Sequence, residues 1–112
     1  MINPRIQVLT LQIAAVCLGI NAAGRYTASC DIDGANSAIV VRLRERVTRE
    51  AIDAMSREER IALWALNETV YLDAFTGSLN PPADIARTVC DELDALLTKL
   101  LAYHPAACEV AA

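Results

Sequence analysis

Hydrophobic residues recur every three or four positions near the start of the chain. This spacing predicts a helix from Pro4 to Ile20. Asn3 supplies its N-cap and Pro4 its first position, because the fixed φ of proline suits a first helical turn. Apolar residues such as Leu11 and Leu18 also widen the apolar surface beyond one stripe. We therefore expect this helix to be covered on two sides.

The period changes to two after Gly24, which can adopt the positive φ that ends a helix. Apolar and polar residues alternate in the runs 25–32 and 39–44, and the turn dipeptide Asp33–Gly34 lies between them. Asp-Gly favours the turns that join antiparallel strands. The sequence therefore predicts a β-hairpin with one apolar face, made of Tyr26, Ala28, Cys30, Ile32, Ile39, Val41 and Leu43.

Two helices are predicted directly after the hairpin. Thr48 caps a short helix that runs through Met55, and Ser56 with Glu59 forms a capping box for a longer helix that ends before Gly77. At about 100° per residue, the hydrophobic residues of the longer helix point in nearly every direction. Such a helix cannot simply lie on a surface.

A last helix is predicted from Asn80 to Pro105, with a regular alternation of three and four between its apolar positions. The expected order of elements is α-β-β-α-α-α, without internal repeats or linkers. We predict a single α+β domain over residues 1–112, mostly helical, in which one β-hairpin packs on a small helical bundle. Residues 1–3 and 106–112 are expected to fray.

Composition places the chain among globular domains and offers little chemistry. Its 112 residues are 54% hydrophobic, carry a net charge of -4 and include one histidine. The turn at residues 31–36 lacks the spacing of a calcium loop. His104, Cys108 and Cys90 do not form the paired ligand spacings of structural zinc. We predict no catalytic residue, no cofactor and no metal.

The four cysteines are expected to be reduced. Cys17, Cys30 and Cys90 fall on apolar faces, where free thiols pack as small hydrophobic groups, and Cys108 lies in the tail. The apolar run 8–20 is too short to cross a bilayer. Gln12 interrupts it, which is unlike a secretory signal. We therefore expect a cytoplasmic protein.

Aromatic residues at helical spacing mark the first candidate surface. On a helix, Trp64, Tyr71 and Phe75 would lie within about 20° of one another, bordered by Arg60 and Asn67. Tryptophan, tyrosine and arginine are enriched at protein interfaces. This set is the predicted protein interface. Leu63, Leu66 and Val70 form the opposite line of this helix and would face the core. The alternative is that both lines belong to the core.

Arginines on the second strand mark another candidate surface. The alternation places Arg42, Arg44 and Arg46 on one strand face, as an alternative nucleic-acid contact. Residues 38–75 resemble the ribbon-helix-helix repressors, which insert paired strands into the DNA major groove. The resemblance implies that Arg42 and Arg44 face bases and that Ser56 or Arg57 contacts phosphates. Residues 61–112 contain two bases and seven acids, which disfavours strong attraction to phosphates.

Surplus apolar surface and a free strand edge indicate a homodimer, since a domain of this size buries only about two thirds of its unfolded surface. We expect a small non-catalytic regulator that binds another protein and inhibits or sequesters it. An anti-activator that blocks the dimerisation of a transcription factor is one example. The alternatives are a ribbon-type DNA-binding regulator and a small enzyme or ligand carrier. Contact with a membrane is not expected.

Overall fold

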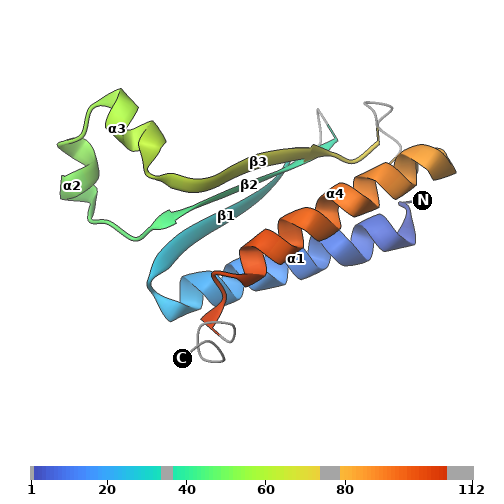
Figure 1. The fold of residues 1–112 in the computed structure, drawn as a ribbon, viewed down its shortest axis with the longest axis horizontal. Helices are drawn as coiled ribbons and strands as arrows, with labels where there is room; N and C mark the ends of the chain where they lie inside the picture. Colours follow the sequence, from blue (N-terminus) through green and yellow to red (C-terminus); the bar gives the residue numbers. More distant parts are fainter. Residues whose placement is uncertain (1, 34–36, 74–78, 106–112) are drawn as a thin grey trace.

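The computed structural model describes residues 2–33, 37–73 and 79–105. Within these residues the elements follow the order α-β-β-α-α-β-α (Figure 1). They are α1 (Pro4–Ala23), β1 (Tyr26–Asp33), β2 (Ala38–Glu45), α2 (Arg49–Asp53), α3 (Arg57–Ala62), β3 (Trp64–Tyr71) and α4 (Ala83–Leu101).

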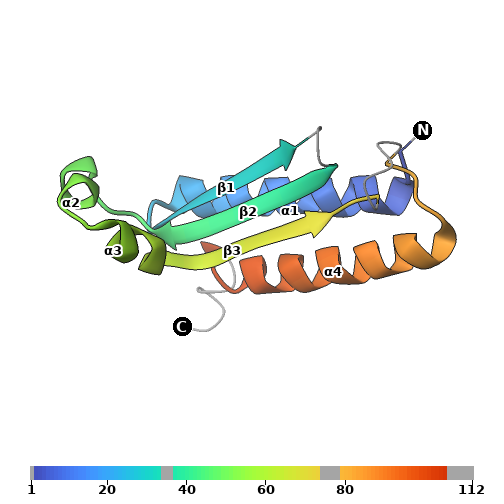
Figure 2. The ribbon, with the colours of Figure 1, turned by 90° about the horizontal axis from the view of Figure 1, so that it is seen from above.

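The molecule has two layers, with α1 and α4 on one side of a three-stranded antiparallel sheet (Figure 1). The strand order is β1-β2-β3, so that β2 is central. No described helix covers the opposite face of the sheet, as the view from above shows (Figure 2). The short helices α2 and α3 lie beyond one end of the strands. The predicted α+β class is confirmed.

The ends of α1 follow the local signals in the sequence. The Asn3 side-chain oxygen accepts hydrogen bonds from the backbone N–H groups of Arg5 and Ile6, at 3.0 and 3.1 Å. Asn3 also donates its own N–H to the carbonyl of Leu79. Gly24 ends the helix with a φ of 85°, a conformation that costs glycine little.

The predicted pairing of β1 and β2 is confirmed. Ala28 lies opposite Leu43, and Ile32 lies opposite Ile39, so that the apolar positions share the face toward the helices. The predicted turn residue Gly34 lies outside the described residues. The hairpin is part of a larger sheet, because β2 also pairs with β3 along its other edge.

The predicted long helix between Ser56 and Gly77 is wrong. The capping box of Ser56 and Glu59 is present, but α3 ends at Ala62 and the chain continues as a strand from Trp64 to Tyr71. A strand lets Leu66 and Val70 pack toward the helices while its backbone bonds to β2. In the order of elements, a third strand replaces most of this helix.

The core lies between the sheet and the two long helices. The predicted apolar stripe of α4 is buried at Ala86, Val89, Leu93, Leu96 and Leu100. The inner face of the sheet meets this stripe and the inner side of α1. The remaining buried hydrophobic residues of the cluster are Ile6, Leu9, Ile13, Cys17, Ile20, Ala28, Ile39, Val41, Leu43, Val70 and Leu72.

The opposite side of α1 is open, contrary to the expectation that this helix is covered on two sides. Leu11 and Leu18 are 61% and 71% exposed, and Val8 is exposed as well. The sheet and α4 occupy only one side of the helix. Among the described helices, α1 alone has the length and apolar composition of a membrane span, and a buried helix of a soluble protein passes the same test.

Candidate functional site

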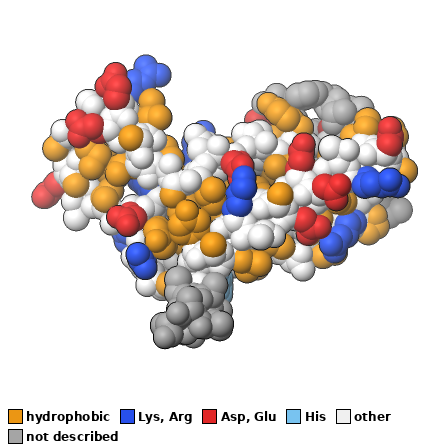
Figure 3. All heavy atoms as spheres, viewed as in Figure 1, with side chains coloured by type: hydrophobic (Ala, Val, Ile, Leu, Met, Phe, Trp, Pro, Cys, Tyr) orange, Lys and Arg blue, Asp and Glu red, His pale blue; other side chains and the backbone are white. Residues whose placement is uncertain are grey.

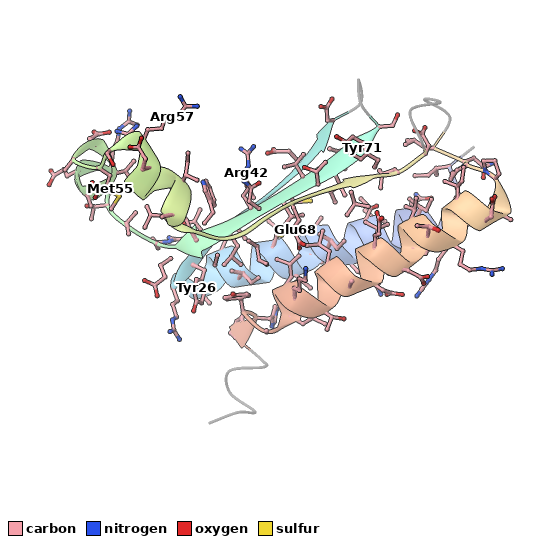
Figure 4. The ribbon with its side chains drawn as sticks, turned by 45° about the horizontal axis from the view of Figure 1, so that its top comes forward. Tyr26, Arg42, Met55, Arg57, Glu68 and Tyr71 are labelled. Carbon is pink, nitrogen blue, oxygen red and sulfur yellow. The ribbon has the colours of Figure 1, made fainter. Side chains whose placement is uncertain are left out.

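The outer face of the sheet brings arginine and aromatic side chains into neighbouring rows. Arg42 lies opposite Asn67 on β3 and donates from Nε to the Asn67 side-chain oxygen at 3.4 Å. The Arg44 guanidinium carbon lies 4.9 Å from the centre of the Trp64 ring, which is within the range of cation–π attraction. Arg42 and Tyr71 point away from the helices, whereas Glu68 points toward α4 (Figure 4).

A β-bulge places Trp64 on this face. Residues seven apart on a regular strand point to opposite faces, since side chains alternate. The register shifts between Leu43 and Arg44. Because one extra residue is inserted in β3 at this point, Trp64 lies opposite Arg44. The extra residue restores parity, so that Trp64, Asn67 and Tyr71 share the outer face. Three of the five residues of the predicted interface set therefore share a face, but of a strand rather than of a helix.

Two of the predicted site residues, Arg60 and Arg46, form contacts away from the outer face. Arg60 donates from Nε to the carbonyl of Ile52 at 3.0 Å, which ties α3 to α2. Arg46 donates to the carbonyl of Asn21 at 3.2 Å, at the end of α1. Phe75 lies outside the described residues. We define the outer-face cluster as Arg42, Arg44, Trp64, Asn67 and Tyr71.

The arrangement implied by the resemblance to ribbon-helix-helix repressors is not found. In that family, single strands pair across a dimer. Here β2 is paired on both edges within one chain, and a strand follows the two short helices. The Ser56 hydroxyl accepts the backbone N–H of Glu59, and Arg57 extends from α3 beyond the end of the sheet (Figure 4).

The inner side of β3 faces a hollow beside α4. Glu68 Oε1 accepts a hydrogen bond from Lys99 Nζ at 2.7 Å, while Glu68 Oε2 is shielded from solvent and has no partner among the described residues. The hollow has two parts of about 380 and 230 Å³. Their lining comes from both elements and includes Tyr71, Asp84, Ile85, Val89 and Glu92 in one, and Glu68, Glu92, Leu96 and Lys99 in the other.

Two cysteine thiols meet between α1 and β1. A hydrogen bond between Cys17 and Cys30 raises the pKa of Cys17, and burial raises it further. The same bond lowers the pKa of Cys30 below that of an ordinary thiol. Burial raises the pKa of Cys90. Cys108 lies outside the described residues. Both thiols of the pair line a hollow of about 280 Å³.

Within the described part of the chain, no three histidine, cysteine or acidic residues come together in a way that could hold a metal ion. The sequence-based expectation of no catalytic residue and no cofactor stays a prediction. The chain matches no protein-family model, and no curated protein or solved structure shows a significant similarity to it. The outer-face cluster is therefore the candidate site on its geometry alone.

Proposed function

We propose that this chain is a small non-catalytic regulator that binds another protein through the outer-face cluster and thereby inhibits or sequesters it. The observation that carries this proposal is the uncovered sheet face, on which Arg44 stacks against Trp64. Tyr71 is exposed on the same face. While this chain is bound, other proteins that use the same surface of the target protein would be unable to bind it.

The composition of the cluster supports an interface. An antiparallel sheet can leave one face to water, but such a face is normally polar. Here the arginine Nε of Arg44 is shielded from solvent and has no hydrogen-bond partner among the described residues. Its contact with Trp64 holds the guanidinium in place, which lowers the entropy lost when it binds a carboxylate. We therefore expect an acidic group in the partner opposite Arg44.

The DNA-binding alternative has less support. Of the three arginines, Arg42 is bonded to Asn67 and Arg46 is bonded to the end of α1. The chain carries a net charge of -4, whereas duplex binding depends on neutralising several phosphates with cations. The enzyme or carrier alternative would use a hollow such as the open ones beside α4 and β1.

Removing the stacked pair is expected to weaken partner binding at least about tenfold, because central tryptophan and arginine residues carry much of the energy of an interface. Trp64→Ala and Arg44→Ala would be compared with the unchanged chain by affinity capture from host lysate, followed by titration of the captured protein. Arg87→Ala, which removes an exposed arginine from α4, is the matched control. Circular dichroism checks that each variant is folded.

Equal capture by all variants would refute the proposed site. If the unchanged chain retained a DNA duplex at low salt and Arg44→Ala did not, the result would favour the DNA-binding alternative instead.

The homodimer predicted from the sequence has a candidate surface on α1. The exposed residues Val8, Leu11, Ala15, Leu18 and Ala22 follow one another at intervals of three and four. This spacing places them in one stripe, as in helices that pair side by side. The stripe has no charged residue, so that a second copy can match it about a two-fold axis. We propose that two copies associate through this stripe.

A charge in the stripe is expected to abolish this association. A single helix pair buries less than the roughly 1,600 Å² of a standard interface, so we expect an equilibrium that depends on concentration. Leu18→Glu should be monomeric in sedimentation equilibrium, because a carboxylate would be buried without a partner. Gln12→Glu, also exposed on α1, should dimerise like the unchanged chain. An unchanged chain that stays monomeric at its highest soluble concentration would contradict the dimer.

A further inference from the structure

No described strand pairs with the second edge of β3. β3 lies at the end of the strand order, with β2 on one side only. The N–H of Leu72 donates to the carbonyl of Ser37 at 2.7 Å, which fixes the alternation of the ladder. Val70 therefore bonds to β2, whereas the backbone N–H and C=O groups of Asn67 and Thr69 point away from β2, toward the second edge.

The corresponding edge of β1 is covered. The Asn21 side chain donates from Nδ2 to the carbonyl of Ala28 at 2.6 Å, and its oxygen accepts the N–H of Ala28 at 2.8 Å. The amide group thus takes the place of a neighbouring strand at this position. β1 also packs beside α1, and Arg46 reaches the end of that helix. The two edges of the sheet are therefore not equivalent.

The helical layer extends further than the sheet on the β3 side. Seen from above, α1 lies behind β1 and β2, whereas α4 lies outside β3 (Figure 2). The hollow described above lies between β3 and α4. A further strand would lie about 4.8 Å from β3, above this hollow, with alternate side chains pointing into it. Val89 and Leu96 supply apolar contacts there.

The charges of the hollow indicate which side chains would fit. Asp84 and Glu92 line it, and Glu68 Oε2 is shielded without a partner among the described residues. Lys99 is paired with the other oxygen of Glu68. Acidic side chains are visible along α4 in the view that has β3 and α4 in front (Figure 3). A basic side chain entering from an added strand would have carboxylates to pair with.

We propose that the free edge of β3 accepts an extended peptide segment of a partner protein, which adds as a fourth strand and places a lysine or arginine in the hollow over α4. This inference rests on the proposed function and specifies the partner's chemistry. Main-chain hydrogen bonds to Asn67 and Thr69 would supply affinity, and the side-chain positions over α4 would supply specificity.

A second copy of the chain does not fit this edge. Pairing of two β3 strands would bring the α4 helix of each copy beneath the strand of the other. The strands would be about 4.8 Å apart, whereas packed helices need about 8–10 Å between their axes. The carboxylates of Glu68 and Glu92 in each copy would also approach the same carboxylates of the other copy, which repel them. The edge therefore favours an isolated extended segment over self-association.

The test uses a peptide probe joined to the full chain after Ala112. The probe has eight residues, the length of β3. Threonine occupies every second position, and valine and arginine occupy the positions between. A flexible linker of about 20 Gly and Ser residues spans about 25 Å and gives a millimolar effective concentration. Amide hydrogen exchange at Asn67 and Thr69 is expected to slow about tenfold relative to a chain with the linker alone.

Two comparisons make the result specific. A probe with glutamate in place of arginine should give little protection, and equal protection would overturn the predicted partner chemistry. Thr69→Pro, which removes an outward N–H at the edge, should abolish the protection, whereas Thr69→Val should retain it. Unchanged exchange at β3 with the arginine probe, or protection confined to β1, would overturn the proposal.

The same pair of variants separates this inference from the proposed function. In the capture experiment, Thr69→Pro should lose the partner while Thr69→Val keeps it. Loss of the partner in Trp64→Ala but not in Thr69→Pro would leave the outer-face proposal standing and refute the edge. Partner binding that survives both Trp64→Ala and Arg44→Ala would refute the outer-face proposal instead.

Discussion

Leu93→Ala is expected to lower the free energy of unfolding by about 3 kcal/mol. Leu93 lies in the middle of α4 and its side chain is completely buried in the core between the sheet and the helices. Truncation removes its transfer free energy and leaves a cavity that the packed sheet can fill only in part. Urea unfolding followed by circular dichroism measures the change as a lower midpoint at an unchanged slope.

Leu101→Ala is the matched control, since Leu101 lies at the end of the same helix and is exposed. Its substitution should change stability by less than about 1 kcal/mol. Similar losses in the two variants would contradict the assignment of one face of α4 to the core.

Asn21→Ala is expected to cost about 2 kcal/mol and to uncover the edge of β1. The change removes both hydrogen bonds between the Asn21 amide and the backbone of Ala28. Ala28 is buried, so its N–H would be left without an acceptor, which is more costly than the loss of an exposed bond. Thermal and urea unfolding would show the loss, and light scattering would report any new association through the opened edge.

Asn67→Ala makes the same change on the outer face, where the amide forms an exposed bond of 3.4 Å with Arg42. We expect a stability change of no more than about 0.5 kcal/mol. If Asn21→Ala were equally mild, the amide of Asn21 would not be holding β1 in place.

The sequence pattern did not predict the strand from Trp64 to Tyr71, for reasons that the structure identifies. Glu68 occupies an inward position, where its contact with Lys99 replaces the expected apolar residue. The bulge beside Arg44 breaks the period of two. The capping box at Ser56 correctly predicts where a helix begins, but that helix ends after six residues instead of continuing toward Gly77. The β-branched residues Thr69 and Val70, between aromatic residues, were the local signal that favoured a strand.

The candidate site was predicted in two separate pieces. The interface set was derived from helical spacing, and the arginine set from strand alternation. The structure brings Arg42 and Arg44 against Asn67 and Trp64, because β2 and β3 are neighbours. The pairing of strand residues that lie twenty or more positions apart cannot be derived from the period of either segment alone.

The sequence by itself determined the elements whose signals are local. The cap at Asn3, the stop at Gly24, the shared face of the hairpin and the buried stripe of α4 each depend on residues within a few turns or one hairpin. Only the tertiary structure decided that residues 64–71 form a strand, that no described helix covers the outer face of the sheet and that α4 lies outside β3. These features depend on which surfaces meet in space, because burial and strand pairing join residues that are distant along the chain.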